Sequence, residues 1–331
     1  MSLWSDRDMD VVLRLACFRY LSRAAIRGFL FEGSALKPHS MEVQAGRILG
    51  RLKAAGLVAS TQRLVGGPGG GSGRLLYFLT REGQKLADAL TGGPPRRPPQ
   101  NGSFLMRHGQ MSAEVALAFR RAARTHPGHD LTEWECDWAA AMKLRSGLVV
   151  PDARIVYHTR HWEFSAFIEV DLATEGTRFF ARKMGRYLDL CLDGSWRKDL
   201  SRWPLVLTVA PTMARAEALK AATEPLLCRP YYAARLARTA EFLFTSLGAL
   251  CGPCSPLGPI WRVPGRDGLQ PLVTGLDVRG FEIDGAREGA PVLSLSVALS
   301  ATSEIRTPAE AQLAESVQTP AGDRGLEEVI D

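Results

Sequence analysis

In the first part of the chain, apolar residues recur three or four positions apart in three successive segments, which is the spacing of amphipathic helices. Ser5 precedes the first segment and Ser22 the second, and serine is a residue type that caps helix N-termini. Ser40 precedes the third segment, which we expect to run to Ala55 and to end at Gly56. The inward positions of this third helix are Met41, Ala45, Ile48, Leu49 and Leu52.

A hairpin is predicted after these helices. Two short β-type runs, 57–63 and 74–80, flank a glycine-rich segment at 66–73. A fourth helix follows, from Thr80 to Leu90. Three helices and a hairpin, in that order, are typical of a winged helix-turn-helix, in which the third helix enters the major groove of DNA.

The polar face of the third helix and its surroundings carry the candidate DNA contacts. Gln44 and Arg47 suit contacts with base edges, and the residues suited to phosphates are Arg51, Lys53, Arg63 and Arg74. The alternatives are an ordinary solvated helix face and a winged helix that binds proteins. Element order, capping, glycine loop and charge all agree with DNA binding, so we expect double-stranded DNA as the partner. A homodimer remains an open option.

Composition divides the chain into segments. Residues 92–107 are rich in proline and glycine and predict an extended linker. It separates a winged-helix domain at 1–91 from a second domain at 108–300. From 301 to 331 the chain is polar and acidic, and we expect a disordered tail.

The second domain alternates helical and strand patterns. The order predicts a mixed sheet with helices on its faces, and hence an α+β fold. Helices are expected at 111–125, 176–192 and 212–227, strands at 131–138, 149–158, 162–172, 205–210, 241–250 and 291–299, and a hairpin at 260–264 and 271–276.

Charge and cysteine content narrow the class of protein. The 331 residues carry a net charge of +6, with a basic N-terminal part and an acidic tail, which favours an anionic partner.

Six scattered cysteines argue against a disulfide framework and favour a reducing compartment. Neither an apolar run of roughly 18–20 residues nor a signal-peptide pattern is present, so we expect a cytoplasmic protein.

Three carboxylates are predicted near strand ends in the second domain. Alternation along 164–172 places Glu169 and Asp171 on one face of their strand, opposite its apolar residues. Asp152 lies on the neighbouring strand if the turn at 159–161 makes the two strands a hairpin. Such a trio suits Mg²⁺, or Mn²⁺, because these ions take oxygen ligands. The alternative is a strand-end turn residue beside a solvated strand face.

The next predicted helix carries a lysine and a tyrosine on one face. Lys183 and Tyr187 are four residues apart, and a lysine beside a metal–phosphate site can orient water or balance charge. The candidate catalytic residues are therefore Asp152, Glu169, Asp171, Lys183 and Tyr187, with the three acids as candidate metal ligands.

These motifs, in this order, resemble two known groups of proteins. Pro151-Asp152, then Glu169-Val170-Asp171, then Lys183 and Tyr187 is similar to the PD-(D/E)xK nuclease superfamily. With Thr174-Glu175 and the winged helix in front, residues 5–250 resemble the replication-relaxation proteins of actinobacterial plasmids and mobile elements. The resemblance implies a role in plasmid replication and DNA relaxation, and a nuclease-like fold for the second domain.

One position departs from the nuclease pattern. The superfamily usually has lysine two residues after the second acid, where this chain has Asp171. Either Lys183 replaces that lysine from the helix and the site is a metal-dependent endonuclease, or the site is inert and the protein is a non-enzymatic DNA-binding regulator or replication accessory. The sequence leaves both open.

A cysteine pair supports a third hypothesis. Cys251-Gly252-Pro253-Cys254 copies the active loop of thioredoxins, but the prolines that follow oppose the helix such a loop needs. We therefore interpret it as a turn with two free thiols rather than as the centre of a redox or zinc-dependent regulator.

Overall fold

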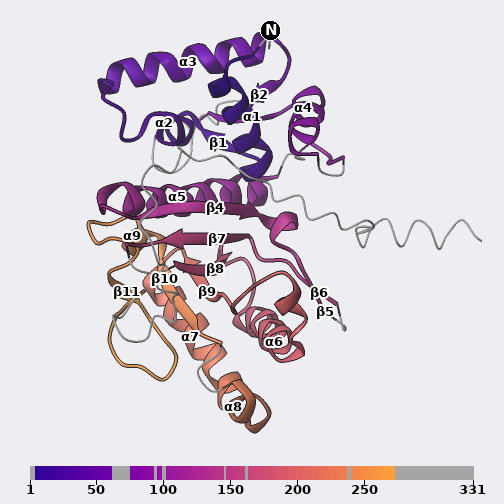
Figure 1. Ribbon diagram of the computed structural model, residues 1–331, viewed down its shortest axis with the longest axis vertical. Coiled ribbons are helices and arrows are strands. Elements are labelled where there is room, and N and C mark those ends of the chain that lie inside the picture. The colour runs from indigo at the N-terminus through magenta and orange to yellow at the C-terminus, as the bar shows by residue number, and fades with distance from the viewer. Residues whose placement is uncertain are drawn as a thin grey trace, which may run out of the picture. The chain divides into compact units, whose positions relative to one another are not determined.

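The N-terminal part of the computed structural model packs helices on a three-stranded antiparallel sheet (Figure 1). The helices are α1 (Asp6–Phe18), α2 (Arg23–Phe31), α3 (Pro38–Ala54) and α4 (Arg81–Thr91), and the strands, in spatial order, are β1 (Leu21–Ser22), β3 (Leu76–Leu79) and β2 (Val58–Ser60). The predicted inward positions of α3 are buried, with Met41 half-buried at their edge.

The structure describes residues 4–61, 75–92, 95–98, 102–144, 147–160, 163–236 and 240–272. The predicted glycine-rich loop at 66–73, with Arg63 and Arg74, lies outside these residues. The predicted strand at 291–299 and the acidic tail also lie outside them.

Short polar side chains cap most of these helices as predicted. Ser5 accepts a hydrogen bond from the Asp8 backbone N–H, Ser22 from Ala25 and Thr80 from Gly83. The prediction for Ser40 was wrong, because α3 begins two residues earlier at Pro38. Proline suits the first helical position, since its fixed φ is already helical and its missing N–H would have no partner there.

A five-stranded mixed sheet forms the centre of the second part of the chain (Figure 1). Its spatial order is β10 (Phe242–Ser246), β9 (Leu205–Ala210), β8 (Glu163–Val170), β7 (Ala153–His158) and β4 (Asp130–Cys136). Strands β4, β7 and β8 pair antiparallel, whereas β8, β9 and β10 pair parallel. The predicted α+β class is therefore confirmed.

Each face of this sheet has its own apolar core. As the alternation predicted, Phe164, Ala166, Ile168, Val170 and Leu172 share one core, which α5 (Ser103–Thr125) covers. Phe167 points into the other core with α6 (Thr177–Asp193) and α7 (Met213–Leu227). The remaining elements are the strands β5 (Met142–Leu144), β6 (Gly147–Val149), β11 (Pro259–Trp261) and β12 (Gln270–Pro271) and the short helices α8 (Pro230–Leu236) and α9 (Leu247–Leu250).

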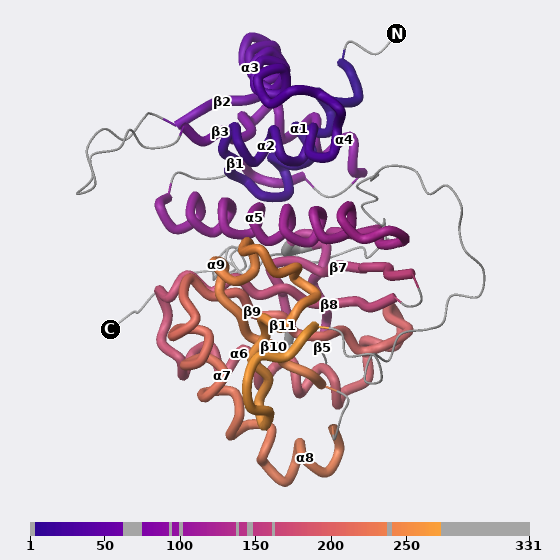
Figure 2. Tube along the Cα trace, turned by 90° about the vertical axis from the view of Figure 1, so that its left-hand side faces the viewer, coloured from indigo at the N-terminus to yellow at the C-terminus, as the bar shows by residue number. Residues whose placement is uncertain are grey.

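Helix α5 belongs to both parts of the chain. It begins eight residues before the predicted start and contributes Ala113, Ala116 and Leu117 to the N-terminal core. Its other side contributes Val115 and Phe119 to the core of the sheet. Figure 2 shows α5 between the N-terminal helices and the central sheet. At Gly109 an added Cβ would lie 2.2 Å from the Phe18 carbonyl oxygen, so glycine permits the close approach of α5 to the end of α1. The domain boundaries predicted above stay predictions.

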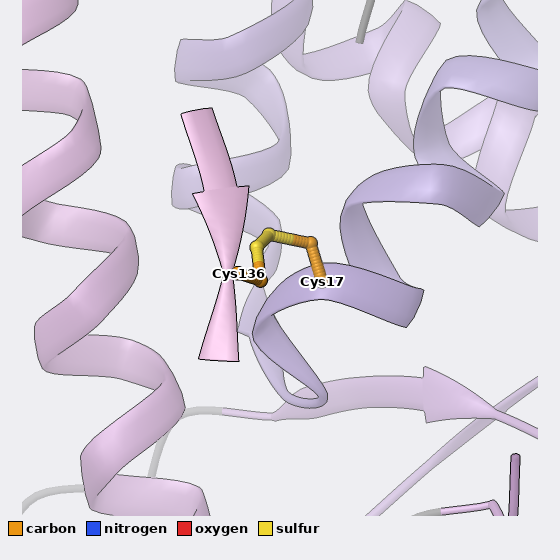
Figure 3. Close-up of a disulfide and its surroundings, with 2 residues drawn as sticks. All are labelled: Cys17 and Cys136. Carbon is orange, nitrogen blue, oxygen red and sulfur yellow. A yellow bond between two sulfur atoms is a disulfide. The ribbon is translucent and has the colours of Figure 1, made fainter. Parts of the chain in front are cut away.

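A disulfide joins Cys17 of α1 to Cys136 of β4 (Figure 3). Their Cα atoms are 5.6 Å apart, a normal separation for a bridge. Scattered cysteines had argued against disulfides, and for this pair that expectation was wrong. Residues 119 positions apart are brought together by tertiary packing, which cysteine spacing does not encode.

The predicted strand at 241–250 is half strand and half helix. Strand β10 ends at Ser246, whose hydroxyl caps α9 by accepting from the Ala249 N–H. Cys251 therefore follows the C-terminus of a helix instead of opening one, and burial raises the pKa of its thiol. This is the reverse of the environment that activates a thioredoxin-like cysteine.

No helix in the described part of the chain combines the length and apolar character of a membrane span.

Candidate functional site

Gln44, Arg47 and Arg51 lie on one side of α3, whereas Lys53 lies on the opposite side. The side with Gln44, Arg47 and Arg51 is here called the α3 face. With α1 it borders a cleft of about 550 Å³, lined by Ser5, Asp6, Arg7, Gln44, Arg47, Ile48 and Arg51. Arg47 is exposed, and no described residue forms an ion pair with it. Three of the six predicted DNA contacts, Gln44, Arg47 and Arg51, therefore line one cleft. A fourth, Lys53, lies on the helix that borders the cleft.

Two of the predicted DNA contacts on α3 have structural partners. The Arg51 Nη2 atom lies 2.7 Å from Asp8 Oδ1, and Lys53 donates to the Ser60 hydroxyl at 2.9 Å. Burial alone would raise the pKa of Asp8, but hydrogen bonds from Ser5 and Arg51 outweigh it and lower that pKa. Arg51 therefore contributes to the fold, although its side chain is 53% exposed.

A second group of polar residues meets at one end of β7 and β8. Ala153 pairs with Ile168, so one more residue along the antiparallel register sets Asp152 opposite Glu169. Two carboxylates on neighbouring strands repel each other unless a cation or a proton neutralises them. The group of Asp152, Glu169, Lys183, Tyr187 and His108 is called the carboxylate site below.

Glu169 is bound by the predicted lysine and tyrosine. Its side chain is 4% exposed, and it accepts hydrogen bonds from Lys183 Nζ and the Tyr187 hydroxyl, both on α6. Burial raises the pKa of Glu169 to about 7; the charge of Asp152 adds to the rise and Lys183 opposes it. A carboxyl group with a pKa near neutrality suits proton transfer.

Asp152 is held from the opposite side of the sheet. It accepts from the Val170 backbone N–H at 2.6 Å, and its Oδ1 lies 3.2 Å from His108 Nε2 of α5. Burial favours the neutral acid, but the bond from His108 and the charge of Lys183 outweigh it and lower the pKa of Asp152. The same bond outweighs the burial of His108 and raises its pKa, which favours an imidazolium beside the carboxylate.

Asp171 is not part of this group. It follows the last residue of β8 and receives two hydrogen bonds, of 2.8 and 2.9 Å, from the guanidinium of Arg215 on α7. The same arginine donates to the Glu175 carbonyl oxygen at 2.7 Å. Such a bidentate pair occupies both carboxylate oxygens and fixes the turn after β8. The structure brings four of the five predicted catalytic residues together and places the fifth against α7.

Sequence reasoning missed His108 and Arg215. His108 precedes the predicted start of its helix, and Arg215 is separated from Asp171 by 44 residues. The apolar residues Phe104, Leu105 and Met106 were the signal that α5 starts earlier. No local pattern indicates that Arg215 reaches Asp171.

The donors of the carboxylate site fit one small divalent cation. Mg²⁺ is often bound by one or two carboxylates together with water and substrate phosphates. Asp152 and Glu169 supply two carboxylates. Burial is the main reason that the pKa of Glu169 is raised, and a cation there would offset the further rise caused by the charge of Asp152. Among the described residues, no three side chains of histidine, cysteine, aspartate or glutamate gather as a metal site. The residues present therefore fit a cation that is held by two carboxylates, with water or substrate as its other ligands.

A comparison with protein families identifies the group to which the chain belongs. The family model described as Replication-relaxation matches residues 14–206, more than half of the chain. The chain is a member of the replication-relaxation family. The matched residues of this replication-relaxation protein include the α3 face and all five residues of the carboxylate site, which supports a role in replication and relaxation. No curated protein matches the chain.

Proposed function

We propose that this replication-relaxation protein binds double-stranded DNA through the α3 face and cuts or nicks a DNA strand at the carboxylate site with the help of Mg²⁺. The observation that carries the proposal is the pair of opposed carboxylates, Asp152 and Glu169, with Lys183 in contact with one of them. The two buried carboxylates suit a divalent cation, and the ammonium group suits a phosphate. DNA with a bound cation supplies both groups.

Each residue of the carboxylate site has a role in this proposal. Asp152 and Glu169 would hold the ion, which supplies Lewis acidity toward a phosphate and lowers the pKa of a bound water. His108 orients Asp152, and Tyr187 orients Glu169. Lys183, which pairs with Glu169, would balance charge on a phosphate oxygen.

The DNA-binding part of the proposal rests on α3. Gln44 and Arg47 lie on the outer side of the helix, with Arg51 one turn beyond Arg47. Gln44 and Arg47 suit base edges, and Arg51 suits a phosphate. The proposal also includes Arg63 and Arg74 as predicted phosphate contacts, and both lie outside the described residues.

A second candidate function follows from Asp171. In an active nuclease of this pattern a lysine usually stands at that position, whereas here a carboxylate is locked to Arg215. In addition, Asp152 and Glu169 already accept hydrogen bonds from protein groups. Both observations favour a protein that grips DNA without cutting it, as a regulator or replication accessory.

Plasmid cleavage separates the two candidates. Supercoiled plasmid is incubated with Mg²⁺ or Mn²⁺ and wild-type protein, Asp152→Asn or Glu169→Gln. Glu163→Gln, on the same strand but outside the site, is the matched control. We expect nicking by wild type and by the control only. If wild type shifts the plasmid on a gel but leaves it as intact as both site variants do, the non-enzymatic function holds.

A further inference from the structure

Exposed apolar side chains gather around the carboxylate site. Phe104 is 49% exposed, Val150 37% and Phe179 51%, which makes them three of the large exposed apolar residues of the described chain. Burying such side chains would be favourable, and their presence beside a polar site points to a ligand that covers them.

One ring contact and two positions along the chain connect these residues to the site. The Phe104 ring stacks on the imidazole of His108 at a centroid distance of 6.1 Å, and His108 bonds Asp152. Val150 is two residues before Asp152. Phe179 lies one helical turn before Lys183 on α6, which places it on the flank of the helix that carries the lysine.

Arginines accompany the aromatic rings. The Arg182 guanidinium carbon lies 6.0 Å from the centre of the Phe179 ring, and Arg186 follows one turn later on the same helix. Arg107 is exposed next to His108. None of the three forms an ion pair with another described residue. We call Phe104, Phe179, Arg107, Arg182 and Arg186, with Val150, the aromatic rim.

We propose that the aromatic rim binds single-stranded DNA, with unpaired bases stacked on Phe104 and Phe179 and phosphates bonded to the rim arginines. This inference rests on the proposed function for the class of substrate and adds the state of the strand at the site. In a duplex the bases stack on each other, so their faces are closed to a protein ring. Exposed aromatic rings interleaved with arginines are the surface that unpaired strands require.

The charge of the rim favours DNA over a protein partner. An apolar protein surface that covered the two phenylalanines would also desolvate the unpaired guanidinium groups of Arg182 and Arg186, which is costly without counter-charges. A phosphate chain supplies those counter-charges while its bases cover the rings. Single-stranded DNA therefore accounts for both the exposed phenylalanine rings and the arginines beside them.

The test is binding to a labelled single strand of mixed sequence and to the same sequence as a duplex, by fluorescence anisotropy with a chelator present so that no cleavage occurs. Phe179→Ala and Phe104→Ala should each weaken single-strand binding about tenfold and duplex binding less than about twofold, because a base stacked on a ring contributes about 1–3 kcal/mol. Phe179→Trp should retain affinity, whereas Phe179→Leu should not. Tyr231→Ala is the matched control, since Tyr231 is a 56% exposed ring with Arg235 over it, on α8.

Several outcomes overturn the inference. Single-strand affinity that is unchanged in Phe104→Ala and Phe179→Ala, or reduced equally in Tyr231→Ala, excludes stacking at the rim. A change in oligomeric state of the rim variants, with unchanged DNA binding, assigns the rim to a protein contact instead. The plasmid assay tests the proposed cleavage separately. The binding assay does not depend on cleavage, because the chelator removes divalent cations.

Discussion

Lys183 of α6 forms an ion pair with Glu169 at the end of β8, yet the pKa of Glu169 stays near 7. Burial and the neighbouring Asp152 therefore outweigh one ammonium group in setting the charge of Glu169. The burial of Glu169, together with its position opposite Asp152, is the basis of the first two predictions below.

Protein stability should depend on pH through Glu169. Its folded pKa of about 7 lies above its ordinary value of 4.5, so the folded state binds the proton more tightly than the unfolded state does. The contribution of Glu169 is thus most favourable below 4.5 and is lost as the pH rises through about 7, by on the order of 3 kcal/mol. Urea unfolding across this interval measures it. Glu169→Gln should remove this part of the pH dependence, and an unaltered profile would contradict the assignment.

Metal binding should reduce that pH dependence. A divalent cation beside Asp152 and Glu169 stabilises both ionised carboxylates and releases the proton that Glu169 holds. We expect the melting temperature at neutral pH to rise with Mg²⁺ in wild type and in Glu163→Gln, but not in Asp152→Asn or Glu169→Gln. Differential scanning fluorimetry with and without the ion provides the measurement. Equal shifts in all four proteins would place the ion elsewhere.

Asp171 and Arg215 should behave as a structural pair. Their side chains are 7% and 17% exposed, so removal of either partner leaves a mostly buried charge alone. Asp171→Ala and Arg215→Ala should each lower the free energy of unfolding by roughly 2–4 kcal/mol, and the double variant by less than their sum. A double-mutant cycle from chemical denaturation tests this. Additive losses would show that the two residues do not stabilise each other.

Reduction of the Cys17–Cys136 bridge should destabilise the protein. The two cysteines are 119 positions apart, and closing a loop of that length restricts the unfolded chain by about 5 kcal/mol in the chain-entropy model. We expect reductant to lower the melting temperature of wild type but to leave Cys17→Ser and Cys136→Ser unchanged. Cys228→Ser, at an exposed free cysteine, is the control and should respond as wild type does.

The two arginines of the α3 face should differ when replaced. Arg47 has no partner among the described residues, so Arg47→Ala should weaken DNA binding and reduce the slope of log affinity against log salt by about 1, without loss of stability. Arg51→Ala should weaken binding and also destabilise the fold, because it leaves the nearly buried Asp8 without its cation. Titrations at several salt concentrations, together with thermal melts, distinguish the two. Unchanged affinity in Arg47→Ala would remove α3 from the proposed interface.

Local features of this protein were predictable from its sequence. The period-two pattern of Phe164 to Leu172 identified the two faces of β8, and the caps at Ser5, Ser22 and Thr80 marked helix starts, because these features depend only on neighbouring residues. The four-residue spacing placed Lys183 and Tyr187 on one face of α6, and both contact Glu169. Their catalytic roles stay predictions.

Features set by tertiary packing were not predictable. Alternation placed Asp171 on the same face of β8 as Glu169, but it could not show that Arg215 of α7 lies close enough to bind Asp171. The contact of His108 with Asp152 requires the docking of α5 at a strand end, and the Cys17–Cys136 bridge requires α1 to lie against β4. Each of these contacts joins segments that are far apart along the chain.

The shared helix α5 has a thermodynamic consequence. One side of it completes the N-terminal core, the other side completes a core of the central sheet, and Gly109 lets its backbone touch the end of α1. Neither core can lose α5 and remain packed, so the free energies of the two are not independent quantities. In calorimetry the described chain should unfold as one cooperative unit, with a single heat-absorption peak where separately folded modules would give two.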